Sequence, residues 1–322
     1  MTAGLPSGPS SPAGAGRYGA FAVEVDPIPL PRGASAKARR LYVRCQGRTL
    51  FGLSQGQFRA YLFPVYTPAG HAVTTESPID HPHHNSLWIG ADHVHAHMPY
   101  GTGERVEEAT YNFYVNETFQ GRAPGRIAAL DLAAEAVGSA LRMAQTLEWR
   151  GPSEWGAPEG RVLAHERRTI LVRPGERAHV IDILSDWQPT DWDMSVGPCR
   201  HAWFTLRVAE ALREAGGGLL GADGRRGAEA LDGAVLPWID FSGPAAGGAR
   251  AGIALIPHRS TAGHPWYVAD WGMMAVNPFI RERRSVRRGE ALSVGVRAVV
   301  HDGDPDFSEL ERLCAEIAGG AP

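Results

Sequence analysis

The sequence has few cysteines, no long apolar run and no excess of charge of one sign. Its three cysteines, Cys45, Cys199 and Cys314, are far apart and odd in number, which argues against a disulfide framework and against a CxxC zinc site. No run approaches the roughly 18 apolar residues that a membrane helix needs. We therefore expect a soluble protein whose thiols are reduced.

Charge is close to balanced. Lys and Arg number 32 and Asp and Glu 35, for a formal net charge of -3, so no broad basic surface is expected to collect phosphates. Nucleic acid and membranes are therefore not expected partners, whereas a homo-oligomer is compatible with the sequence. The N-terminus lacks the basic start and apolar segment of a secretory signal, so we expect a cytoplasmic protein with a disordered Gly/Pro/Ser tail over residues 1–20.

Glycine and proline are abundant, at 39 and 24 residues, and they separate short β-like runs. Sustained helical periodicity is nearly absent, and no unit repeats at a fixed solenoid or propeller period. This pattern is typical of an all-β protein, and we predict a large β-sandwich in a single domain over residues 21–322. Strands are expected at 40–44, 59–65, 140–149, 162–172, 179–186, 203–208, 251–256, 266–276 and 292–301.

One helix is predicted at the end of the chain. Apolar residues recur on one face from Phe307 to Ile317, Ser308 and Glu311 have the spacing of a capping box, and the Gly319-Gly320 pair ends the segment. A shorter helix over 208–214 is the second candidate.

Histidine is concentrated in one stretch. Six of the 13 histidines lie between residues 81 and 97, in DHPHHNSLWIGADHVHAH. Neutral imidazole is a common ligand of transition metals and titrates near physiological pH, so the stretch is suited to a metal or to proton transfer. In an extended segment alternate residues share a face, which makes His81, His83, His93 and His95 the expected ligands of a divalent metal (Zn, Mn or Fe), with His97 on the same face as His93 and His95. Proton chemistry without a metal is the alternative, and any one of these histidines can equally be a solvated or hydrogen-bonded structural residue.

Two further regions suit a small-molecule site. The segment 200–207 places His201 and Arg207 on one polar, aromatic face, and the segment 258–281 combines aromatics with amides, although a solvent-facing strand and a core strand are the alternatives. For catalysis the expected residues are His84, His201 and Glu166, the last as a candidate carboxylate acid or base. For substrate binding they are Trp88, Arg207, His264, Trp266 and Asn277.

Five motifs occur in a characteristic order: DHPHHNSLW, PWIDFSGP, AGIALIPH, HPWYVADWG and NPF. With them the chain resembles the soluble PmoA-like family, whose members carry a methane-oxygenase label, from about residue 40 to 300. The family's His-Pro-His-His element falls on residues 81–84, its tryptophan on Trp88 and its strand arginine on Arg207, whereas His93 and His95 depart from its pattern. The resemblance implies a β-sandwich related to sugar-catabolic proteins, and HAWFTL is similar to a stretch of the aldose mutarotases, whose supersandwich is one form that this fold can take.

These features together predict a carbohydrate-active enzyme, a lyase, hydrolase or epimerase that acts on a sugar or an oxidised glycoside through the histidine-rich site. No nucleotide cofactor motif is present. A non-catalytic sugar-binding module and a metal-dependent oxygenase are the alternatives.

Overall fold

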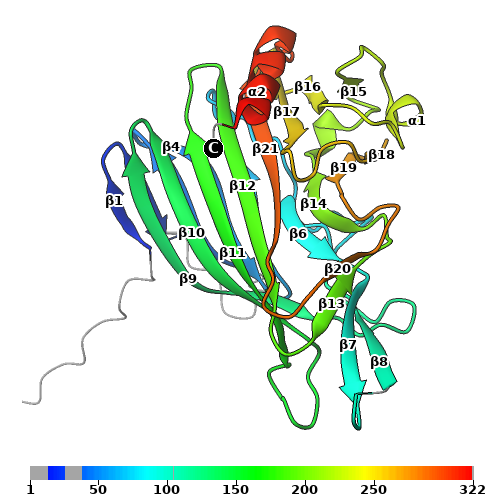
Figure 1. Ribbon diagram of the computed structural model, residues 1–322. Helices are drawn as coiled ribbons and strands as arrows, with labels where there is room; N and C mark the ends of the chain where they lie inside the picture. Colours follow the sequence, from blue (N-terminus) through cyan, green and yellow to red (C-terminus); the bar gives the residue numbers. More distant parts are fainter. Residues whose placement is uncertain (1–13, 26–37, 104, 321–322) are drawn as a thin grey trace, which may run out of the picture.

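The computed structural model describes residues 14–25, 38–103 and 105–320, and these form three antiparallel sheets (Figure 1). The largest sheet consists, in spatial order, of β1 (Gly16–Tyr18), β2 (Phe21–Val25), β3 (Ala38–Cys45), β4 (Arg48–Gly56), β5 (Ala60–Val65), β6 (Leu87–Ala91), β14 (Ala202–Arg207), β19 (Met273–Val276) and β18 (Tyr267–Ala269). The second consists of β15 (Gly218–Gly221), β16 (Ile239–Pro244), β17 (Arg250–Pro257), β21 (Leu292–Asp302), β12 (Ala178–Pro189), β11 (Val162–Arg173), β10 (Ala140–Arg150) and β9 (Arg126–Val137).

A small third sheet and four short helical segments complete the described chain. The sheet contains β20 (Arg284–Val286), β13 (Asp193–Val196), β7 (Val94–Tyr100) and β8 (Arg105–Tyr111), in that order. The helices are η1 (Glu210–Leu212), α1 (Ala228–Leu231), η2 (Ala246–Gly248) and α2 (Phe307–Gly319).

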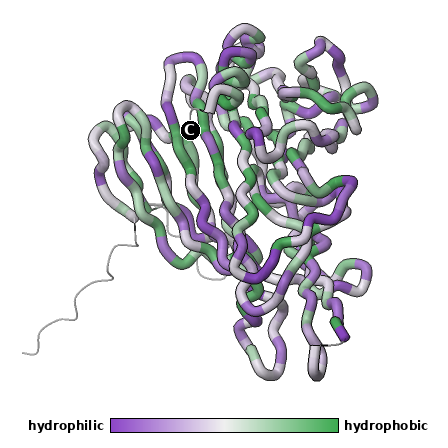
Figure 2. The backbone as a smooth tube through the Cα atoms, in the orientation of Figure 1, coloured by the Kyte–Doolittle hydropathy of each residue, from purple (hydrophilic) through white to green (hydrophobic). Residues whose placement is uncertain are grey.

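The two large sheets pack face to face and enclose the main core. Phe204 and Leu206 of β14 belong to this core, and Trp149 of β10 stacks on Trp203 of β14 with ring centroids 5.1 Å apart. In Figure 1 the green strands β9–β12 lie in front of the blue strands of the other sheet, and Figure 2 shows hydrophobic and hydrophilic residues alternating along these front strands. The predicted all-β sandwich is therefore confirmed.

The C-terminal helix α2 covers part of the outer face of the eight-stranded sheet. Asp306 is its N-cap and accepts a hydrogen bond from Glu309 N at 3.2 Å, so the predicted Ser308 capping box is wrong: the Ser308 hydroxyl instead donates to Asp306. The predicted end is confirmed, since Gly320 has a left-handed conformation with φ of 86°. Within the described residues, no helix combines the length and apolar character needed to cross a membrane.

Three local predictions are corrected by backbone pairing. The segment 266–276 is not one strand, because a turn at Gly272 (φ 91°) folds β18 back on β19. The segment 208–214 contains only the three-residue η1. Residues 16–18 pair with β2, so the tail expected over 1–20 is shorter than predicted, and residues 1–13 lie outside the described residues.

Candidate functional site

Polar and aromatic side chains gather on the face of the nine-stranded sheet that points away from the main core. Tyr61 on β5 pairs with Trp88 on β6, which pairs with Thr205 on β14. Paired residues of antiparallel strands share a face. Tyr61 and Trp88 form a separate aromatic cluster with Tyr114, while the neighbours of Thr205 on β14 point into the main core. This outer face is the floor of the candidate site.

The loop before β6 places three histidines over this floor. The ring centroids of His81 and His84 are 4.6 Å apart and stacked, those of His83 and His84 are 4.6 Å apart, and those of His81 and His83 are 5.8 Å apart. The segment is a turn in which His84 N donates to His81 O at 2.9 Å. The expectation of an extended segment is therefore wrong, and all three imidazoles converge.

Aromatic rings border the three imidazoles. Trp271, in the turn between β18 and β19, stacks on His81 with centroids 4.3 Å apart. The Trp88 ring lies 5.1 Å from that of His84, and the Tyr114 ring lies 5.8 Å from that of His83. The three histidine rings are therefore enclosed by the aromatic rings of Trp271, Trp88 and Tyr114.

Asp80 connects this loop to β14 and the segment that follows. Arg207 Nη2 donates to one Asp80 oxygen at 2.6 Å and Arg213 Nη2 to the other at 3.4 Å, and the Arg207 guanidinium lies 4.8 Å above the Trp271 ring. Burial opposes ionisation of Asp80, but the hydrogen bonds from Arg207 and His81 outweigh it and hold the pKa of this carboxyl well below its usual range. Asp80 is therefore a carboxylate that fixes the loop.

Arg59 is a buried clamp beneath the site. Its Nη1 donates to the carbonyl of His83 at 2.6 Å and to Asn85 Oδ1 at 2.8 Å, and its Nη2 donates to the carbonyl of Tyr114 at 2.6 Å and to Asn116 Oδ1 at 2.7 Å. All four acceptors are neutral, and no carboxylate of the described residues forms an ion pair with Arg59. Burial lowers the pKa of Arg59 to about 10, so it is still a cation at neutral pH.

The imidazoles above this cation are uncharged. Burial, and then the charge of Arg59, lower the pKa of His83 to about 4, and burial with the neighbouring His83 places the pKa of His84 far below its ordinary value. At neutral pH both rings are therefore neutral, each with one N–H donor and one acceptor nitrogen.

A second cluster forms around Asp92, directly after β6. One oxygen of Asp92 accepts from His93 Nδ1 at 2.7 Å, and the other accepts from His201 Nδ1 at 3.1 Å. Burial raises the pKa of Asp92, but the hydrogen bonds from His201 and His93 outweigh it and lower the pKa to about 2. Asp92 is thus a buried carboxylate that orients two imidazoles.

Tyr114 joins the two clusters into one site. Its ring stacks on His201 with centroids 5.1 Å apart and an interplanar angle of 27°, and it also lies 5.8 Å from the ring of His83. Burial raises the pKa of Tyr114, so its hydroxyl is protonated at neutral pH. The site therefore extends from Asp80 across Tyr114 to Asp92.

The expected four-histidine metal set does not converge. His95 lies in β7 of the small sheet, where its Nδ1 is 2.9 Å from the Thr110 hydroxyl and its Nε2 is 3.2 Å from the Gly197 carbonyl. His81 and His83 lie in the other cluster, against Trp271 and Tyr114. In the described part of the chain, the ligand atoms that come within 4.8 Å of one another as a group of three belong to Asp92, His93 and Cys199.

One family model matches residues 40–315. The chain belongs to DUF6807, a family of unknown function. No curated protein matches it in sequence. The resemblance to the soluble PmoA-like family stays a prediction.

Three solved structures are similar in shape to this DUF6807 chain. A protein from Synechocystis sp. PCC 6803 is 11% identical with a TM-score of 0.31, and the match covers 93% of this chain and 99% of that one. A putative aldose 1-epimerase from Klebsiella pneumoniae is 9% identical with a TM-score of 0.32, covering 94% and 89%. The 4-alpha-glucanotransferase from Thermococcus litoralis is 10% identical with a TM-score of 0.30; 86% of this chain matches 39% of that one. Likeness at this level carries no argument about function.

Glu166 of the DUF6807 chain lies inside the sandwich and apart from the histidines. Its oxygens accept from Arg168 at 2.8 and 3.0 Å, from Trp149 Nε1 at 2.8 Å and from the Ser185 hydroxyl at 3.0 Å. The Arg168 guanidinium also bonds the carbonyl of Ala60 in the opposite sheet at 3.1 Å. The expected catalytic role does not fit this position, because Glu166 is fully paired and bridges the two sheets.

Three residues expected to bind substrate have other surroundings. His264 is exposed in a turn, and Trp266 is buried with its Nε1 donating to the Leu236 carbonyl at 2.9 Å. Asn277 is buried, where its Nδ2 donates to the Cys199 carbonyl at 2.7 Å, so it shapes the loop that carries Cys199. Trp88, Arg207, His84 and His201, by contrast, all lie at the site.

Arg59, Asp92, Tyr114 and Cys199 belong to the site although sequence reasoning assigned them no role there. Asp92 directly precedes His93 within the histidine-rich stretch, which was the available signal. Tyr114 and Arg59 have no local motif, since their positions depend on pairing between distant strands.

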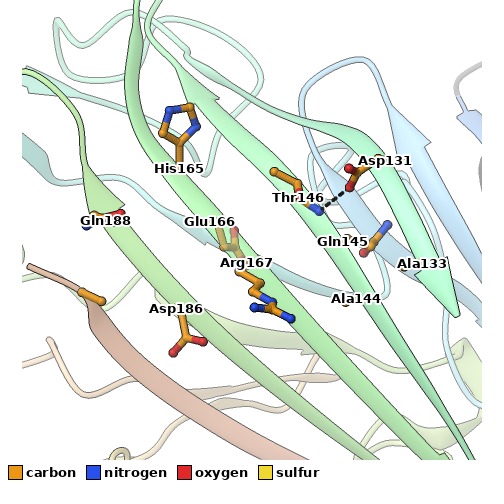
Figure 3. Close-up of a pocket in the computed structure, with 11 residues that line it drawn as sticks. Asp131, Ala133, Ala144, Gln145, Thr146, His165, Glu166, Arg167, Asp186 and Gln188 are labelled. Atoms are coloured by element: carbon orange, nitrogen blue, oxygen red, sulfur yellow. Dashed lines mark hydrogen bonds between the residues drawn. The ribbon is translucent and has the colours of Figure 1, made fainter. Parts of the chain in front are cut away.

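A polar groove lies on the outer face of the eight-stranded sheet (Figure 3). His165, Arg167, Asp186 and Gln188 line it together with Asp131, whose carboxylate accepts from Thr146 N at 3.1 Å. It has no aromatic wall, and the His165 and Arg167 side chains are exposed. The aromatic, partly buried site around Tyr114 is therefore the better candidate.

Proposed function

We propose that this DUF6807 protein is an enzyme that acts on a sugar-like molecule carrying a carboxylate, with His201 as its acid–base group. The observation that supports this most strongly is the position of Tyr114 between the three-histidine cluster and the Asp92–His201 pair. Binding groups and a proton-transfer group are thereby adjacent.

The walls of the site suit a sugar ring. Trp271 is partly exposed and offers an aromatic surface, and a sugar presents C–H groups on one face and hydroxyls around its edge. His83 and His84 are neutral, so each can both donate to and accept from a hydroxyl.

The charge of the site favours an anionic substrate. Arg59 is a buried cation with neutral hydrogen-bond acceptors, and Arg207 has Nε and Nη1 atoms that are buried without a hydrogen-bond partner in the described chain. A buried cation is costly unless a negative charge lies near it. Asp80 neutralises part of this charge, and a substrate carboxylate would neutralise more.

His201 is placed for proton transfer. Because Nδ1–H donates to Asp92, Nε2 carries the lone pair, and its hydrogen-bond donor is Arg200 Nε at 3.2 Å on an exposed side chain that can turn away. Nε2 would accept a proton from the substrate, and the Asp92 carboxylate would stabilise the imidazolium that forms. Removal of a proton from the carbon beside a carboxylate is the first step of an epimerase or a lyase that acts at that carbon.

The test combines binding and isotope exchange. A panel of uronic and aldonic acids is screened by thermal shift against the matching neutral sugars, and the best ligand is then incubated in D₂O and followed by NMR. We expect acids to bind more tightly than neutral sugars and to exchange the proton beside the carboxylate. His201→Gln should retain binding and lose exchange at least about 100-fold, while the surface variant His165→Ala should behave as wild type.

Equal binding of acids and neutral sugars would argue against the charge reasoning. Exchange that persists in His201→Gln would exclude the assigned acid–base role. Binding without any turnover by the wild type would instead support a non-catalytic sugar-binding module.

A further inference from the structure

A group of unlike ligand atoms lies at the Asp92 end of the site. A carboxylate oxygen of Asp92, a ring nitrogen of His93 and the sulfur of Cys199 are all within 4.8 Å of one another. Asp92 and Cys199 are buried, with 3% and 8% of their surface exposed, and His93 is half-buried. These residues come from two segments, the corner between β6 and β7 and the loop between β13 and β14.

The loop that carries Cys199 is held on both sides. Cys199 N donates to the Phe279 carbonyl at 3.0 Å, and Asn277 donates to the Cys199 carbonyl at 2.7 Å. Gly197 N donates to the His93 carbonyl at 2.9 Å, and a Cβ at Gly197 would lie 2.6 Å from the Phe279 carbonyl oxygen. The sulfur is therefore positioned against the Asp92–His93 corner by the backbone.

We propose that Asp92, His93 and Cys199 bind a divalent cation of the zinc class. Zinc accepts mixed oxygen, nitrogen and sulfur ligands, whereas magnesium and calcium prefer oxygen alone and manganese favours carboxylates and water. Three protein ligands leave a fourth position for water or a substrate oxygen, as in catalytic zinc sites. On binding, the Cys199 S–H bond breaks, its proton goes to solvent and the thiolate electron pair forms the bond to the metal, while His93 binds through its ring nitrogen that carries no proton.

The local charge favours Asp92, His93 and Cys199 over the three-histidine cluster as the place for a metal ion. His81, His83 and His84 lie close to Arg59 and Arg207, which repel a cation, and among the described residues they do not form a ligand group of the required spacing. Asp92 supplies a carboxylate at the other end of the site. Arg122 approaches one Asp92 oxygen at 3.9 Å, and the other oxygen faces His93 at 2.7 Å. The anionic end of the site is therefore the favourable place for a metal.

Cobalt is the probe, because a thiolate bound to Co²⁺ gives an intense near-ultraviolet charge-transfer band. Protein purified without a polyhistidine tag is stripped with a chelator and titrated with Co²⁺, and Zn²⁺ is then added as a competitor. We expect saturation at one Co²⁺ per chain, a thiolate band, and displacement by Zn²⁺. Cys199→Ser should abolish the band, and Asp92→Asn or His93→Ala should weaken binding about tenfold or more.

Cys45→Ser is the matched control, because Cys45 is another free cysteine with no such neighbours. The absence of stoichiometric Co²⁺, or a band that survives in Cys199→Ser, overturns the proposal. If Cys199→Ser does not fold, protection of the wild-type thiol decides: Zn²⁺ should slow the modification of Cys199 by methyl methanethiosulfonate and leave that of Cys45 unchanged, and equal rates overturn the proposal. These measurements need no substrate, so their failure is distinct from failure of the isotope-exchange test.

Discussion

Replacing Arg59 tests how the site is held together. Arg59 joins the loop of His83 to the loop of Tyr114 through four hydrogen bonds, two of them to backbone carbonyls. Arg59→Met keeps most of the side-chain volume and removes every donor. The two loops then lose the connection that positions His83 beside Tyr114.

The expected loss of stability follows from these contacts. A buried acceptor left unpaired costs about 1–3 kcal/mol, so the two carbonyls alone account for about 2–6 kcal/mol. Removing a buried guanidinium also removes its desolvation penalty, which offsets part of this loss. We therefore expect Arg59→Met to lower the free energy of unfolding by roughly 2–4 kcal/mol. Arg59→Lys, which keeps the charge but not the planar fork, should be intermediate.

Urea unfolding followed by circular dichroism measures the change, with the exposed Arg48→Met as control. A second readout is the pKa of His83, measured by NMR. It should rise part of the way from about 4 towards its ordinary value, since burial is the larger cause of its depression and the charge of Arg59 the next. A loss of stability no larger than that of Arg48→Met, or an unchanged pKa of His83, would refute this account of the clamp.

Two other predictions concern stability. Glu166→Ala leaves Arg168 buried without its carboxylate and should destabilise the protein by about 3–5 kcal/mol in urea unfolding, whereas retention of wild-type stability would show that the pair does not join the sheets. For pH, the folded-state pKa values of His83 (about 4) and Asp92 (about 2) are lower than those of the unfolded chain, so the unfolded state binds protons first on acidification. Stability should therefore fall as pH decreases from about 6.5 to 4 through His83 and further from about 4 to 2 through Asp92, and a flat profile of the unfolding midpoint from pH 7 to 4 would contradict the burial of His83.

The fold was predictable because strand periodicity is local. Alternation along β10, β11 and β12 is visible in the sequence, and the helix α2 shows its apolar face and its final glycines directly. The predicted capping box was wrong because both Asp306 and Ser308 can cap a helix, and the N-cap in the structure is Asp306. The hairpin at Gly272 was missed because apolar residues flank the three-residue turn 270–272 closely on both sides.

The site was only partly predictable because it is assembled by pairing between distant strands. The histidine density drew attention to residues 81–97, but it could not show that His81, His83 and His84 form a turn while His95 enters β7. Asp92 and His201 are 109 positions apart and meet because β6 pairs with β14. Glu166 was misassigned because a sequence does not show on which face of β11 a carboxylate lies.

The distribution of charge across the site suggests how a substrate would be oriented. Arg59 and Arg207 lie at the end that carries the three histidines, and the Asp92 carboxylate lies at the other end with His201. An anionic substrate would therefore point its carboxylate towards Arg59 and Arg207 and place its neighbouring carbon near Tyr114, within the range of the His201 imidazole. A cation at Asp92, His93 and Cys199 would stand on the same side as His201 and would strengthen that orientation, because it would attract a substrate oxygen at the end opposite to the arginines. The two proposals share Asp92, and both predict the same direction of binding.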